Sequence, residues 1–183
     1  MLKGYEQDKA ANAPQPKYRC LVWACPAHYY TNFTYWTQHC WGVTCVNDME
    51  AMLSYQPITI GDKEQALADL VRCYEKMMMR SHTNGGYVNL LDECWKMCEK
   101  FHTNIVIMYD HVSCKNVGGL HGLFEDQARE RGIHLIWIPH DVMDPRTVSR
   151  REMREAFSQY MVTVLNEKPL DPTLLDYEDA LSW

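Results

Sequence analysis

One segment, Asn104 to Gly122 (NIVIMYDHVSCKNVGGLHG), constrains the fold more than any other part of the chain. It begins with five apolar residues, IVIMY, a run of the length that a buried β-strand needs, and then changes to the polar and reactive residues DHVSCKN. A helical pattern follows, with Val117, Leu120, Phe124 and Ala128 near one face and Gly132 at its end. A strand, a loop and a helix in this order predict a parallel sheet whose carboxyl edge carries the loop chemistry.

The rest of the chain repeats this alternation of strands and helices. Three more apolar segments predict strands at residues 19–24, 42–46 and 133–138. Amphipathic patterns predict helices at residues 31–39, 63–80, 87–101 and 150–164, with Asp62 and Ser149 as N-caps and Glu152 completing a capping box. The alternation predicts an α/β fold with right-handed crossovers, which we expect to be a flavodoxin-like three-layer domain. Its four-stranded sheet is expected to be mostly parallel, in the order 2-1-3-4.

The chain divides into three parts by composition. Residues 1–17 are polar with two prolines and are expected to be a linker or an N-terminal extension. Residues 18–168 contain all the predicted strands and would form the α/β domain, and residues 169–183 form an acidic C-terminal tail. A chain of 183 residues is long enough for one domain with a substantial core.

Composition excludes several function classes. The formal net charge is −6 and no basic stripe is present, which argues against nucleic-acid binding. No segment approaches the run of about 20 apolar residues that a membrane span needs, and the N-terminus lacks the apolar core of a secretory signal. Eight cysteines without a CxxC pair favour a reducing cytoplasm, with thiols that are free or bound to metal.

Soft metal ligands follow the predicted strands, where parallel strands would bring them to one edge. They are Cys25 and His28, Cys45 and Asn47, His111 and Cys114, and His140 and Asp141. This concentration suggests a metal or cluster site, but cysteine also packs as a small buried hydrophobe. Cys25 and Cys45 therefore stay open between the two roles. The spacing of the other thiols predicts core positions for Cys20, Cys73, Cys94 and Cys98 and leaves Cys40 undecided.

Cys114 differs from the other cysteines because its neighbours are polar. Ser113 and Lys115 flank it, and the expected helix begins directly after it, where the helix dipole would favour a thiolate. A thiolate there would bind a metal or attack an electrophile. His28 and Tyr29 would line a pocket for a flat substrate or lie at the surface. No GxGxxG or Walker A loop is present, which argues against ordinary nicotinamide or P-loop chemistry.

The residues from 104 to about 165 resemble the C-terminal part of the benzoyl-CoA reductase and 2-hydroxyacyl-CoA dehydratase subunit family. The similarity lies in an apolar strand, the Ser113-Cys114-Lys115 loop, a helix, a Gly132-Ile133-His134 turn, and the sequence DVMDPR before the Ser149 helix. Residues 18–48 are compatible with the same domain but less diagnostic.

The resemblance implies paired subunits, each of which holds an iron–sulfur cluster, commonly [4Fe–4S], between α/β domains. Cys114 would be one cluster ligand, and Ser113 and Lys115 would orient it or contact the substrate. His28, Tyr29 and His111 would form the pocket wall, and no catalytic residue is assigned. An ATP-hydrolysing activator would supply a low-potential electron to an acyl-CoA thioester, giving a ketyl-like radical anion.

Family chains carry a further domain before this one, with the remaining cysteine ligands. Here the cluster would be completed by ligands from outside the chain or by other cysteines. The resemblance implies part of an ATP-dependent reductase of an aromatic acyl-CoA such as benzoyl-CoA. The alternatives are a 2-hydroxyacyl-CoA dehydratase subunit, a flavodoxin-like scaffold without catalysis, and an enzyme that uses Cys114 as nucleophile. The chain by itself is expected to be inactive.

Overall fold

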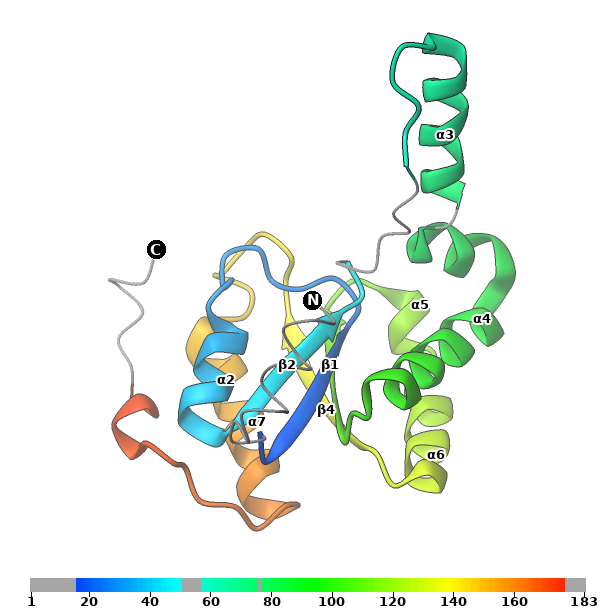
Figure 1. The fold of residues 1–183 in the computed structure, drawn as a ribbon. Helices are drawn as coiled ribbons and strands as arrows, with labels where there is room; N and C mark the ends of the chain where they lie inside the picture. Colours follow the sequence, from blue (N-terminus) through cyan, green and yellow to red (C-terminus); the bar gives the residue numbers. More distant parts are fainter. Residues whose placement is uncertain (1–15, 51–56, 76, 177–183) are drawn as a thin grey trace, which may run out of the picture.

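The protein is built around a four-stranded parallel sheet with the order β2-β1-β3-β4, as the sequence predicted (Figure 1). The computed structural model describes residues 16–50, 57–75 and 77–176. The strands are β1 (Tyr18–Trp23), β2 (Val43–Asp48), β3 (Ile105–His111) and β4 (His134–His140). Because every pairing is parallel, the carboxyl ends of all four strands lie on the same edge of the sheet.

The two central strands are buried on both faces, which explains why their sequences are continuous apolar runs. Cys20 and Val22 of β1 face one core and Leu21 and Trp23 face the other. Residues 105–109 of β3 are also completely buried or nearly so. The period of two along each strand therefore supplies two separate cores.

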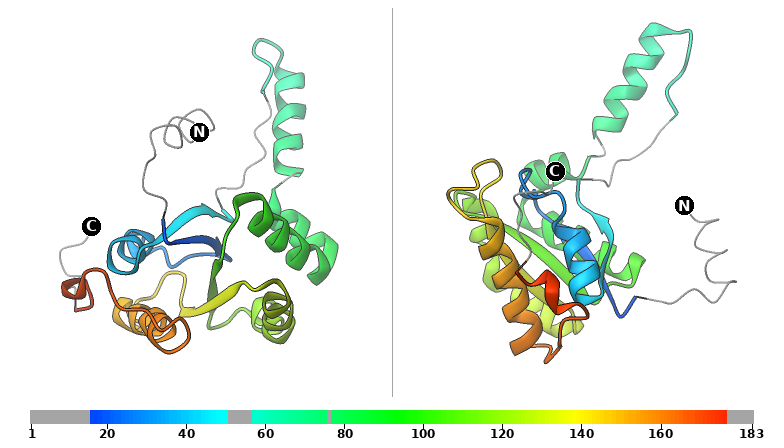
Figure 2. Two further views of the ribbon diagram at one scale, coloured as in Figure 1. Left: turned by 60° about the horizontal axis from the view of Figure 1, so that its bottom comes forward. Right: turned by 90° about the vertical axis from the view of Figure 1, so that its left-hand side faces the viewer.

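One face of the sheet is covered by α2 (Phe33–Trp41) and α7 (Arg150–Thr163) (Figure 2). Helix α7 begins with the predicted capping box, in which the Ser149 hydroxyl accepts from the Glu152 backbone N–H and the Glu152 carboxylate accepts from the Ser149 N–H. Its buried stripe contains Met153, Phe157 and Met161, all fully enclosed. This layer holds the larger aromatic core.

The opposite face is covered by α4 (Met78–Phe101), α5 (Lys115–Gly118) and α6 (His121–Arg131). Cys94 and Cys98 of α4 are buried here, as predicted, and Trp95 packs edge-on against Phe124 of α6. The sheet and its two helical layers confirm the flavodoxin-like three-layer architecture.

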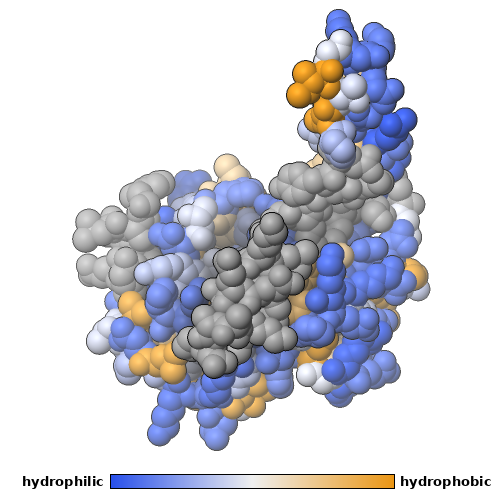
Figure 3. Space-filling view, viewed as in Figure 1, coloured by the Kyte–Doolittle hydropathy of each residue, from blue (hydrophilic) through white to orange (hydrophobic). Residues whose placement is uncertain are grey.

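Helix α3 (Lys63–Glu75) departs from the prediction, because it projects away from the sheet (Figure 1). Asp62 caps it as expected, since its Oδ1 accepts from the backbone N–H groups of Glu64 and Gln65, each at 3.1 Å. The apolar stripe expected in the core is exposed instead, and it consists of Leu67, Leu70, Val71 and Tyr74. Cys73 is half-buried, so its predicted core position is wrong. Figure 3 shows hydrophobic residues on this projecting segment.

Helix α4 consists of two helical segments that meet at a kink at Gly86, and the second segment corresponds to the helix predicted at residues 87–101. The backbone leaves helical geometry at Gly86, whose φ is 71° and ψ −176°. A glycine tolerates this positive φ, so the chain can kink there between the two helical segments. Among the described residues, no helix is both long and apolar enough to cross a membrane.

The last described residues pack against α2. The backbone N–H of Leu170 donates to the Cys40 carbonyl at 2.7 Å, and the Trp36 indole donates to the Leu174 carbonyl at 2.9 Å. A short 3₁₀ helix, η1 (Pro172–Leu174), ends this stretch. The division of the chain at residues 17 and 168 stays a prediction.

Candidate functional site

The loops at the carboxyl edge are tied to one another by backbone hydrogen bonds. The His28 N–H donates to the Val142 carbonyl at 2.9 Å, and the Val112 N–H donates to the His140 carbonyl at 3.0 Å. Ala24, directly after β1, has a φ of 65°, which an L-residue rarely adopts. The chain therefore turns sharply out of β1 and places Cys25 beside the loops that follow β3 and β4.

Cys114 is the N-cap residue of α5 and is half-buried. Its N–H donates to the His111 carbonyl at 2.9 Å, and its carbonyl accepts from the Gly118 N–H at 3.1 Å. Helix α5 has only four residues, whereas the sequence suggested a longer helix starting there. A single turn has a small dipole, so the functional case for Cys114 depends on the cavity that it lines.

A cavity of about 200 Å³ lies between the ends of β1 and β3. Cys114, Cys25 and His111 line its polar side, and its apolar and aromatic walls include Trp23, Met49, Leu90 and Tyr109. The structure thus brings together two of the cysteines and one of the histidines that the sequence assigned to the sheet edge.

Ser113 fixes the orientation of His111. The Ser113 backbone N–H donates to His111 Nδ1 at 3.0 Å, and the Ser113 hydroxyl lies 3.1 Å from the same nitrogen. Since Nδ1 accepts a hydrogen bond, the proton of the neutral ring belongs on Nε2. His111 can then act as a donor.

His140 is completely buried next to His111, and their ring centroids are 5.4 Å apart. Burial lowers the pKa of His140, and the nearby His111 lowers it further. His140 is therefore kept neutral and packs edge-on against Tyr109, with the ring centroids 5.1 Å apart.

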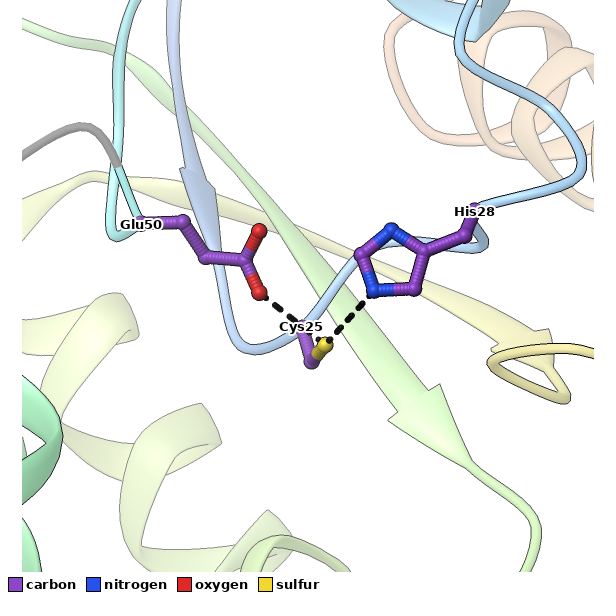
Figure 4. Close-up of side chains that lie close together, drawn as sticks. All are labelled: Cys25, His28 and Glu50. Carbon is purple, nitrogen blue, oxygen red and sulfur yellow. Dashed lines mark hydrogen bonds between the residues drawn. The ribbon is translucent and has the colours of Figure 1, made fainter.

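A second group of donors lies on the other side of Cys25 (Figure 4). The Cys25 thiol donates to Glu50 Oε1 at 3.0 Å, and its Sγ lies 3.9 Å from His28 Nε2. Burial and the neighbouring Glu50 carboxylate raise the pKa of Cys25 to about 12. The sequence did not single out Glu50, although its position just past the second strand was a usable signal.

Cys45 lies inside β2 and not in the loop after it, although it lines a cavity at the carboxyl edge together with His28 and Glu50. Strand β2 continues to Asp48, so Cys45 lies within the strand, paired in register with Cys20 of β1. A hydrogen bond from the Cys20 thiol lowers the pKa of Cys45 and raises that of Cys20. This contact favours the packing role for Cys45.

The remaining predicted substrate residues lie in different places. The Tyr29 hydroxyl donates to the Val148 carbonyl at 2.6 Å, which fixes the loop before α7. Lys115 and Ser113 are exposed at the start of α5 and do not line the cavity of Cys114. His28 lines a neighbouring cavity of about 200 Å³ together with Tyr30, Asp48 and Glu50.

The sequence also matches a family of known proteins. A family model described as 2-hydroxyglutaryl-CoA dehydratase, D-component, matches residues 1–161. The chain belongs to this family. The resemblance seen in the sequence is thereby confirmed, and the family is one of subunits of 2-hydroxyacyl-CoA dehydratase-type complexes. Comparison with curated proteins gave no match.

An iron–sulfur cluster, which this family implies, needs cysteine thiolates as ligands. Cys25 and Cys114 are the two cysteines that line the cavity. The Cys25 thiol is directed to Glu50 and His28, which leaves Cys114 available at the cavity wall. Within the described residues, Cys114 would fit such a cluster as one ligand, and the other ligands would have to come from other residues or chains.

Proposed function

We propose that this D-component family member is a cluster-holding part of a multi-subunit 2-hydroxyacyl-CoA dehydratase, with Cys114 as a thiolate ligand of a [4Fe–4S] cluster. The observation that carries the proposal is the half-buried position of Cys114 on the wall of a cavity at the sheet edge. The family match supports the reaction class. When bound, the cluster would supply single low-potential electrons to the acyl thioester.

The residues around Cys114 would bind and orient the substrate. Ser113 holds His111 with its proton on Nε2. In that orientation His111 is suited to donate a hydrogen bond to the carbonyl oxygen of an acyl thioester. Lys115 is exposed beside the cavity and would attract the phosphates of coenzyme A. His28 and Tyr29 remain proposed pocket residues, and Tyr29 would act by holding its loop.

A second candidate reaction is the ATP-dependent reduction of an aromatic acyl-CoA such as benzoyl-CoA. The aromatic walls of the cavity, Trp23 and Tyr109, favour a flat ring as the acyl group. Either reaction would require a homologous cluster-holding subunit and an ATP-hydrolysing activator as partners. We propose the cytoplasm as the location, because the thiols must remain reduced.

The test is iron and acid-labile sulfide analysis of the complex purified without oxygen with its partner subunits. We expect Cys114→Ser to lower the cluster content severalfold, while Cys73→Ser, a half-buried cysteine on α3, leaves it unchanged. Activity with a 2-hydroxyacyl-CoA against benzoyl-CoA then distinguishes the two reactions. Full cluster content in the Cys114→Ser complex would refute the assignment, and an iron-free wild type would favour a scaffold.

A further inference from the structure

We propose that Cys25, His28 and Glu50 form a second metal site, separate from Cys114, which binds one divalent cation of the zinc class. One ligand atom from each of the three residues lies within 4.8 Å of the other two. The inference rests on these contacts and does not depend on the cluster assignment.

Strand pairing places the three donors together. Cys25 and His28 belong to the loop after β1, and Glu50 follows β2, the neighbouring strand in the sheet. The Met49 N–H donates to the Val22 carbonyl at 2.9 Å, so the segment leading to Glu50 is fixed to β1. The hydrogen bond from the His28 N–H to the Val142 carbonyl fixes the loop that carries Cys25 and His28. Backbone contacts thus hold both ligand-bearing segments before any ion binds.

The donor types match a borderline cation. A thiolate, an imidazole and a carboxylate are the three ligand types that zinc takes, and three protein ligands leave a fourth position for water. Tetrahedral zinc geometry requires donor separations of about 3.4–3.6 Å. The Cys25 sulfur lies 3.0 Å from Glu50 Oε1 and 3.9 Å from His28 Nε2, on either side of that value. Small side-chain rotations would therefore suffice.

Accessibility and charge also suit an ion. His28 and Glu50 are exposed, while Cys25 is half-buried, so a cation reaches the site from solvent. Without a cation the Cys25 proton is shared with the Glu50 carboxylate. A bound cation would replace that proton, because only the thiolate is a metal ligand. The adjoining cavity of about 200 Å³, which His28 and Glu50 line, has room for water at the open position.

The test is titration of the metal-free, reduced 183-residue chain with Zn²⁺ alone in a calorimeter. We expect one saturable site per chain, which His28→Ala and Glu50→Gln each weaken at least tenfold and Cys25→Ser abolishes. Cys73→Ser serves as the matched control and should bind as the wild type does. Co²⁺ in place of Zn²⁺ should show a thiolate charge-transfer absorption that Cys25→Ser removes.

Three results would overturn the site. They are the absence of saturable binding to the wild type, unchanged affinity in both His28→Ala and Glu50→Gln, and loss of binding in Cys114→Ser. The last result would make Cys114 a ligand of the same ion. His28 and Glu50 are exposed, so their substitution leaves the core intact and the comparison interpretable. Cluster content is measured separately, so failure here leaves the Cys114 assignment standing.

Discussion

Phe157 joins the two helices that cover one face of the sheet, and its removal tests the layer that supports the site. Its side chain is fully buried, with Phe33 at a centroid distance of 5.8 Å and Trp36 at 5.7 Å, both edge-on. Truncation of a buried Phe to Ala costs about 3–5 kcal/mol of unfolding free energy, including the lost aromatic contacts. For a chain of this size each kcal/mol lowers Tm by roughly 2–4 °C, so we expect Phe157→Ala to melt roughly 6–20 °C lower.

The measurement is urea and thermal unfolding under reducing conditions, followed by circular dichroism. The matched control is Val162→Ala in the same helix, where the side chain is 51 % exposed and the change should stay within about 0.5 kcal/mol. The urea dependence should keep the same slope, because the surface exposed on unfolding hardly changes. A loss below about 1 kcal/mol for Phe157→Ala would refute the packing of α7 against α2.

Substitutions at three further positions test individual contributions to stability. Ser149→Ala removes the side-chain acceptor of the capping box and should cost about 1 kcal/mol in urea unfolding, whereas Ser149→Asp, which restores an acceptor, should cost less. At Gly132 an added Cβ would meet open space, but the backbone φ of 65° is strained for an L-residue. We therefore expect Gly132→Ala to lower the free energy of unfolding, measured by thermal melting, by about 1 kcal/mol. An unchanged melting temperature would contradict this. The pKa of buried His140 is lowered from 6.5, so the unfolded chain binds more protons and stability should fall as pH decreases below about 6.5. His140→Gln should flatten that slope, and an unchanged slope would mean that another group titrates.

The sheet edge was predictable because each strand–loop–helix unit is encoded locally. A short apolar run followed by polar residues predicted His111 and Cys114 at the carboxyl end of β3, and the structure puts both on one cavity. The Ser149–Glu152 capping box was likewise predictable, since its partners are three residues apart.

Other features required the tertiary arrangement. Periodicity alone predicted a buried stripe on α3, yet the described sheet faces are already covered by α2 and α7 on one side and by α4 and α6 on the other. Cys73 is therefore outside the core. Cys45 illustrates the same limit, because β2 ends two residues later than expected and Cys45 therefore lies inside the strand rather than near its end.

The sequence by itself determined the α/β class and the run of thiols and histidines after the strands, because these follow from run length, period and caps; the strand order was expected by analogy with flavodoxin-like domains. The tertiary structure decided which of these side chains meet. Cys25 and Glu50 are 25 positions apart, and only the pairing of β1 with β2 brings the thiol within 3.0 Å of the carboxylate. No pattern along the chain encodes that distance, since it depends on the register of two strands and the turn at Ala24.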